Sequence, residues 1–541
     1  MRPAGRLALA AMCVVLGGAV THGQLRKQAR EGAPVQSLTA AERATLGDPL
    51  FTLVLQATPT ETTLDGIERR LMGATGTRRL FVVHEQGLDP TRGGSRRSVL
   101  TYRGTTQGQQ LQPNVVLSIS FTDQALLADD IEAWGWDDAH SRYNYYKLDR
   151  QPGEAAPSWK FRGSSVGADA LTPAARAGTC MRCHINGAPV MKELPLPWNN
   201  WHSFKSTLDY LDGVGSDDWP IAATPRFRTL TGAESLEVDV IVPSIKQFNG
   251  RRVKALVRPL PGAAGSEVTD GKRLLKPLFV STEYNLNSAP QTSGLHPFPA
   301  VGSGPAEAVA VPDTFFLNAN LLAGGGLLQY RGVNVPDARQ FGSVLAVTAA
   351  EYRQLVEDFH TTIGGARFDT QFAWFTPEAS HVDNHLVDVL VREGIVTPEF
   401  AASVLAVDLE TPVFSAPRAS LLRFVPATFR FKPRGPDDVP TAHPDAMTRS
   451  VIQAIRAAGT PAAGSPEATW LALLEDPDPL DKVRGLVRDY LQRERSALAG
   501  AGRAAELKRL YALLLDRREK AVAAVPDIVE STFLFPIGSG Q

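Results

Sequence analysis

Two cysteines and a histidine lie together in the run Cys180-Met181-Arg182-Cys183-His184. Two thiols three residues apart on one helical turn can each add to one of the two vinyl groups at a haem edge. The next residue then faces the iron, so the imidazole of His184 can be its axial ligand. The Cys-x-x-Cys-His spacing therefore predicts one covalently attached haem c, bound by Cys180, Cys183 and His184, with His184 as the metal ligand.

Two other chemistries are open to the same cysteine pair. A Cys180–Cys183 disulfide would be either inert or a redox dithiol, but a redox motif of that kind usually follows a strand and opens a helix. Here an alanine-rich helical run precedes the pair. A zinc site would need a third or fourth ligand and usually a second cysteine pair. The spacing favours haem c over both.

The first 23 residues are typical of a secretory signal peptide. Arg2 and Arg6 give a basic start, and the apolar run 7–20 is too short for a comfortable membrane span. The third cysteine of the chain, Cys13, lies in this run. No later stretch approaches twenty apolar residues. We therefore expect a periplasmic or secreted protein, without a membrane span in the mature chain, in the compartment where haem c is attached.

At Cys180, Cys183 and His184 the segment resembles a mono-haem c-type cytochrome. The resemblance covers the motif and its immediate surroundings, and it implies covalent haem binding and electron transfer with a redox partner protein. In the ordinary carriers of this family, the motif is near the N-terminus of a small helical domain. Here residues 24–179 precede it and are mostly strand-like. That order is more similar to the small β-rich cytochromes whose motif ends the domain.

The sixth iron ligand decides between electron transfer and catalysis. Met191 and His202 are two candidates close to the motif, beside another residue or an open position. A methionine ligand raises the reduction potential and suits electron transfer. An open position would instead permit a haem-dependent peroxidase or oxygenase, or a haem-based sensor of small molecules. Dihaem peroxidases need two attachment motifs, and this chain has one. No catalytic residue is predicted.

Other clusters favour structural roles. His381 and His385 lie four residues apart, with Asp383 between them, and this spacing can bind a metal. Histidines on a helix surface are common, so the pattern favours no metal. The aromatic runs 134–136 and 143–146 could line a haem pocket, but a packed β-domain would use the same residues. Core packing is the favoured interpretation.

The pattern of apolar residues predicts an α+β fold. The N-terminal and middle regions are β-rich with a haem-bearing helix, and a mainly α-helical C-terminal region follows. We expect a signal peptide at 1–23, a β-rich region at 24–215 ending in the haem-binding segment, a mixed β/loop region at 216–348 and a helical region at 349–541. Strands are predicted at 51–55, 79–84, 98–102, 115–121, 143–148, 159–161, 238–242, 253–257 and 274–283. Helices are predicted at 351–359, 380–392, 398–407, 446–457, 481–498 and 504–522.

The composition and length of the chain exclude several classes of protein and partner. The chain has 541 residues, 56 basic against 57 acidic side chains and a formal net charge of −1. This balance gives no reason to expect nucleic acid as a partner. Charged residues at 21% and hydrophobic residues at 43% exclude a disordered chain. The length is too great for one ordinary core and too great for a simple electron carrier. The oligomeric state is not predicted.

Overall fold

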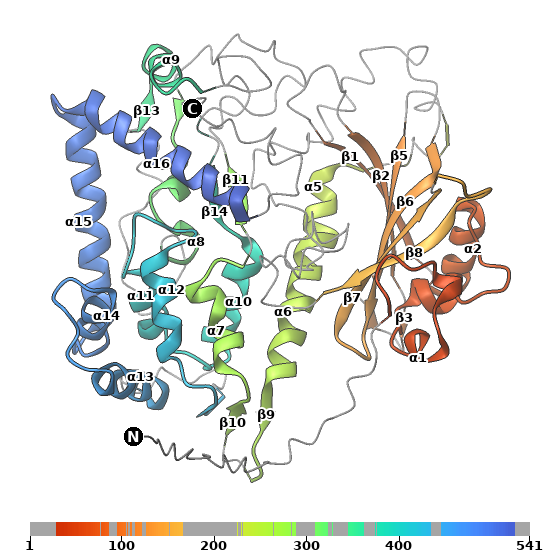
Figure 1. Cartoon of the computed structure of the whole chain (residues 1–541), viewed down its shortest axis with the longest axis horizontal. Coiled ribbons are helices and arrows are strands. Elements are labelled where there is room, and N and C mark those ends of the chain that lie inside the picture. Colours follow the sequence, from red (N-terminus) through yellow and green to blue (C-terminus); the bar gives the residue numbers. More distant parts are fainter. Residues whose placement is uncertain are drawn as a thin grey trace, which may run out of the picture.

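The computed structural model describes residues 29–75, 77–85, 95–103, 105–106, 109–110, 114–121, 126–150, 152–165, 224–225, 229, 231–262, 265–282, 284–287, 309–322, 327, 345–361, 374, 376–433 and 445–524. The fold is α+β, as the sequence predicts: an antiparallel sheet forms the N-terminal region, and helices dominate the C-terminal region (Figure 1). The predicted signal peptide lies outside the described residues, as does the predicted haem-bearing helix.

The N-terminal region is built on one antiparallel sheet of six strands. They are β1 (Thr77–Glu85), β2 (Ser95–Arg103), β5 (Val115–Phe121), β6 (Leu126–Asp137), β7 (Arg142–Asp149) and β8 (Ser158–Ser164), in the order β1-β2-β5-β6-β7-β8. A short hairpin, β3 (Thr105–Thr106) and β4 (Gln109–Gln110), lies between β2 and β5 in the sequence. Successive side chains point to opposite faces, so Leu117 joins one core and Val116 the other.

Helical segments cover one face of this sheet. They are η1 (Val35–Ser37), α1 (Ala40–Arg43), η2 (Phe51–Leu55) and α2 (Leu64–Thr75). Their apolar residues, among them Leu50, Phe51 and Ile67, are buried with Leu117 and Trp159 of the sheet. The sheet therefore has an interior on this side.

The opposite face packs against a second helical layer. It consists of α5 (Ala233–Leu236), η7 (Glu237–Ile241) and α6 (Val242–Leu256). Ile241, Ile245 and Phe248 recur at helical spacing and are buried with Trp134 and Tyr143 of the sheet. Helix α6 thus lies between the sheet and the C-terminal helices (Figure 1).

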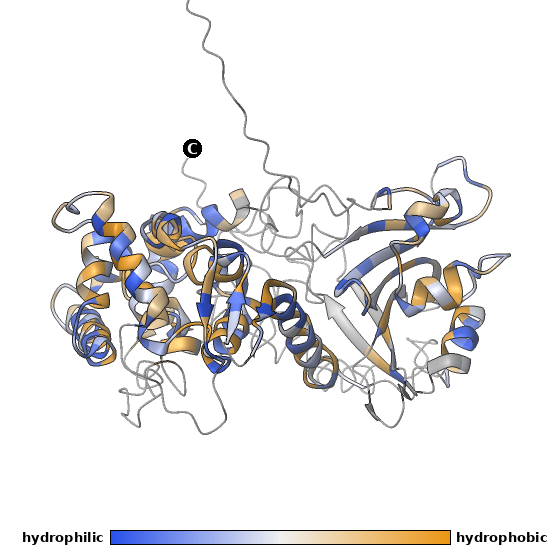
Figure 2. Cartoon of the chain, turned by 90° about the horizontal axis from the view of Figure 1, so that it is seen from below, coloured by the Kyte–Doolittle hydropathy of each residue, from blue (hydrophilic) through white to orange (hydrophobic). Residues whose placement is uncertain are grey.

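The C-terminal region is a helical assembly with one extended core. Its helices are α7 (Gly271–Phe279), η9 (Asp313–Phe315), α8 (Ala319–Leu322), α9 (Ala349–Asp358), α10 (His381–Arg392), α11 (Pro398–Leu405), α12 (Ala416–Leu421), η12 (Leu422–Phe424), α13 (Ala446–Ala457), α14 (Pro466–Leu474), α15 (Pro479–Ala499) and α16 (Arg503–Ala524). Short strands accompany them: β9 (Val257–Pro259) and β15 (Phe429–Phe431) flank β10 (Ser266–Val268), β11 (Tyr284–Asn287) pairs with β14 (Thr376–Ala379), and β12 (Val309–Ala310) pairs with β13 (Ala346–Val347). The helices carry hydrophobic and hydrophilic stripes, as Figure 2 shows, and the apolar stripes meet in a common core.

Most predicted elements are confirmed, but four predicted strands are wrong. The run 51–55 is the helical turn η2, and the backbone N–H of its first residue, Phe51, donates to Asp48 Oδ1 (2.9 Å). The runs 238–242 and 253–257 fall almost entirely in η7 and α6, and 274–283 lies largely in α7. Their buried apolar residues follow helical spacing, as Leu274, Leu275 and Leu278 do in α7, and tertiary packing overrides the strand-like pattern.

Candidate functional site

The predicted haem residues Cys180, Cys183 and His184 lie in the stretch 166–223, outside the described residues. Met191 and His202 lie in the same stretch, so all five residues are outside the part of the chain that the structure describes. Residues on either side of this stretch are described and bonded to the sheet. Ser165 donates its N–H to the Tyr143 carbonyl (2.9 Å), and the Tyr143 N–H donates to Ser165 Oγ (3.0 Å). Thr231 donates its N–H to the Leu80 carbonyl of β1 (3.0 Å).

The aromatic runs are core residues, as the sequence favours. The Tyr143 ring meets Trp134 and Trp136 edge-on, with centroids 4.8 and 4.7 Å away, and it stacks on Phe248 of α6 at 6.0 Å. The Tyr143 hydroxyl donates to the Ser244 carbonyl (3.2 Å), and burial raises the pKa of Tyr143. These rings join the sheet to α6.

In the structure, His385 and Asp383 of α10 are hydrogen-bonded to neighbouring elements. Asp383 accepts from the N–H and hydroxyl of Thr282. Asn249 Nδ2 donates to His385 Nδ1 (3.1 Å) and to the Val382 carbonyl (2.9 Å), so the imidazole proton of His385 is on Nε2. Burial lowers the pKa of His385 to about 4 and lowers that of His381 below its usual value. In the described part of the chain, no three His, Cys, Asp or Glu side chains are grouped to hold a metal ion.

A different histidine is held by a buried carboxylate at the tip of the β6–β7 hairpin. His140 Nδ1 lies 2.8 Å from Asp137 Oδ2, and the His140 backbone N–H donates to Asp137 Oδ1 (3.1 Å). The backbone turns back at Ser141, which has a φ of +54°. The Asp137 carboxylate is fully buried, while the His140 side chain is 29% exposed. Sequence reasoning missed this pair, although an aspartate three residues before a histidine in a turn was its visible signal.

Gly47 of the N-terminal layer and Asn144 of β7 hold Asp137 in place. Its Oδ2 accepts the N–H of Gly47 (2.8 Å) and Asn144 Nδ2 (3.2 Å). Asn144 Nδ2 also donates to a second buried carboxylate, Asp48 (2.8 Å), which accepts the Tyr146 hydroxyl as well (2.6 Å). Burial raises the pKa of Asp48, and the nearby Asp137 carboxylate raises it further. Two acidic groups therefore share one amide donor beneath the hairpin.

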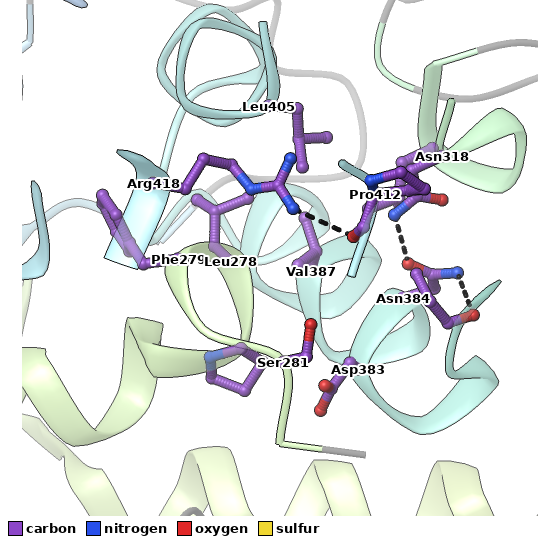
Figure 3. Close-up of a pocket in the computed structure, with 13 residues that line it drawn as sticks. Leu278, Phe279, Ser281, Asn318, Asp383, Asn384, Val387, Leu405, Pro412 and Arg418 are labelled. Atoms are coloured by element: carbon purple, nitrogen blue, oxygen red, sulfur yellow. Dashed lines mark hydrogen bonds between the residues drawn. The ribbon is translucent and has the colours of Figure 1, made fainter. Parts of the chain in front are cut away.

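A small polar cavity lies among α7, α8, α10, α11 and α12 (Figure 3). Its volume is about 20 Å³, and its polar lining consists of Ser281, Asn318, Asp383, Asn384 and Arg418. Asn318 Nδ2 donates to Asn384 Oδ1 (2.8 Å), while Asn318 Oδ1 accepts no hydrogen bond from the described residues. Arg418 donates to the Pro412 carbonyl (2.9 Å). This space is enough for one water molecule and too small for a substrate.

The helices of the described ranges include none that is long and apolar enough to cross a membrane. The chain matches no protein-family model, and no curated protein or solved structure is significantly similar to it.

Proposed function

We propose that the chain is a periplasmic or secreted mono-haem c-type cytochrome that transfers electrons to or from a redox partner protein. The observation that carries the proposal is the run Cys180-Met181-Arg182-Cys183-His184. The predicted signal peptide supports it independently, because haem c is attached outside the cytoplasm.

The donor set fits one covalently held haem. The thiols of Cys180 and Cys183 would form the two thioether bonds, and the His184 imidazole would bind the iron from one side. The other cysteine, Cys13, lies in the predicted signal peptide, so the mature chain has two thiols for two vinyl groups. A bound haem supplies a one-electron couple between ferric and ferrous iron.

The described residues hold the ends of the motif-bearing stretch. Ser165 is bonded in both directions to Tyr143, and Thr231 is bonded to Leu80. Tyr143 is itself locked between two tryptophans and α6.

The test is the mass and spectrum of the full-length chain, expressed with its leader in a host that matures c-type cytochromes. We expect one haem per mature chain, resistant to acid–acetone extraction, and a low-spin spectrum that does not change on addition of peroxide. A C180A/C183A double variant should lose the covalent haem. Wild-type protein without added haem mass would refute the proposal. A high-spin spectrum that shifts with peroxide would favour a peroxidase or oxygenase instead.

A further inference from the structure

A buried amide that lines the small polar cavity of Figure 3 has incomplete hydrogen bonds. Asn318, which lies immediately before α8, is 8% exposed. Its Nδ2 donates to Asn384 Oδ1 (2.8 Å), and Asn384 Nδ2 donates to the Ala379 carbonyl (3.4 Å), which fixes the orientation of both amides. Asn318 Oδ1 accepts no hydrogen bond from the described residues. Because buried acceptors are nearly always bonded to protein or to ordered water, the cavity favours an occupant that donates a hydrogen bond.

Arg418 of α12 also lines the cavity and has N–H groups without an acceptor. This buried side chain donates to the carbonyls of Asp408, Thr411 and Pro412 (2.8, 2.6 and 2.9 Å). The three bonds leave at least two of the five N–H groups of the guanidinium without an acceptor in the described part of the chain. An occupant that accepts hydrogen bonds as well as donating them would satisfy Arg418 and Asn318 together.

Charged groups around the cavity favour a neutral occupant. Burial lowers the pKa of Arg418 to about 10, so its guanidinium is still charged at neutral pH. The carboxyl group of Asp383, which accepts from the N–H and hydroxyl of Thr282, lines the same cavity. A cation would meet the guanidinium, and an anion would meet Asp383 and the oxygen of Asn318, which is costly in a buried site. The cavity volume of about 20 Å³ is enough for one water molecule.

We propose that this cavity is a binding site for one water molecule, which donates to Asn318 Oδ1 and accepts from Arg418. Ser281 is a further partner, since its Oγ accepts the N–H of Phe414 (3.0 Å) and its hydroxyl proton can go to the water. Three partners are the usual number for a buried water. The water joins the residue before α8 to α12 and is part of the helical assembly. This inference does not depend on the proposed function.

A high-resolution crystal structure of the mature chain tests the site directly. We expect one peak of water density within hydrogen-bonding distance of Asn318 Oδ1 and of a nitrogen of Arg418. Crystals soaked in sodium bromide should show no anomalous peak at this position. An empty cavity would overturn the inference. An anomalous peak would overturn it as well, because it would identify a site for anions.

Two leucine variants test whether Asn318 binds the water. N318L and N384L both remove the hydrogen bond between the two asparagines, but only N318L removes the Oδ1 acceptor. We expect the water peak to be lost in crystals of N318L and kept in crystals of N384L. Water that stays in N318L, or that is lost from both variants alike, would contradict the proposal. If neither variant folds, the wild-type structure still decides between an occupied and an empty cavity.

Discussion

At the scale of single residues, the corner beneath the β6–β7 hairpin contains two fully buried carboxylates, Asp48 and Asp137. Glycines make room for both of them. A Cβ on Gly135 would collide with Asp48, and one on Gly47 would lie 2.9 Å from Asp137 Oδ1. Burial of a charge is costly unless hydrogen bonds compensate. Asp48 receives three donors, and burial still outweighs them, so its pKa is raised.

This raised pKa predicts how stability depends on pH. In the unfolded chain Asp48 titrates near 4, and in the folded protein it titrates higher. Its stabilising contribution is therefore complete below about pH 4 and is lost as the pH rises through the folded pKa. The limiting slope is about 1.4 kcal/mol per pH unit. The side chain at position 48 of the D48N variant is uncharged at every pH. Urea unfolding from pH 4 to 8 should therefore show that wild type loses stability relative to D48N as the pH rises.

The matched control is D138N, which removes a carboxylate that is 68% exposed from the same hairpin. Its stability difference from wild type should be nearly constant over this pH range. D48N also costs one hydrogen bond, since an amide N–H₂ would face the N–H of Phe51, and this cost is independent of pH. A difference between D48N and wild type that does not vary with pH would show that Asp48 keeps an ordinary pKa.

At the scale of elements, the start of α9 shows how one side chain fixes two helices. Thr348 Oγ1 accepts the N–H of Glu351 (3.2 Å), and Glu351 accepts the N–H of Thr348 (2.9 Å), which completes a capping box. The same carboxylate accepts from Arg503 at the first residue of α16 (2.7 Å). Arg503 lowers the pKa of Glu351 to about 2. The stability that this carboxylate provides is therefore present above about pH 4.5 and is lost as the pH falls toward 2.

Replacement of this carboxylate should loosen both helix starts. E351A should lower the free energy of unfolding by about 1 kcal/mol, the usual cost of a lost cap, with a smaller loss at pH 3 than at pH 7. Urea unfolding at the two pH values measures it. E357A, at an exposed position of the same helix, should change stability by less than about 0.5 kcal/mol. Equal effects of E351A and E357A would contradict the role given to the capping box.

The elements that were predictable from sequence are those with local signals. The strand 115–121 and the helix 446–457 were predicted with their observed bounds, because alternation and helical spacing are strong there. The helical turn η7, the end of α6 and most of α7 were predicted as strands, since short apolar runs resemble strands until packing against other elements is known. The haem-attachment motif could be recognised because its residues, Cys180, Cys183 and His184, are close together in the sequence. The Asp137–His140 pair could not be predicted in this way, because Asp137 is held by the backbone N–H of Gly47, ninety residues earlier in the chain.

At the scale of the whole molecule, α6 belongs to both regions. One side of the helix packs on the sheet through Phe248, which stacks on Tyr143. Asn249, the next residue, donates to the Val382 carbonyl of α10 (2.9 Å). Val382 itself belongs to the same apolar cluster as the sheet residues. The sheet and the C-terminal helices therefore share a core along α6, and destabilisation at this helix should reach both.

F248A tests this coupling. Removal of a buried phenylalanine costs about 3 kcal/mol or more, which corresponds to roughly a hundredfold loss of hydrogen-exchange protection. If the shared core joins the two regions, mass-spectrometric hydrogen exchange should show this loss in β7 and in α10 alike. The control V238A changes a residue of η7 that is 67% exposed. It should leave the hydrogen-exchange protection of β7 and α10 unchanged. Loss of protection confined to β7 would mean that the sheet unfolds on its own, and that α6 supports it without coupling it to the helices.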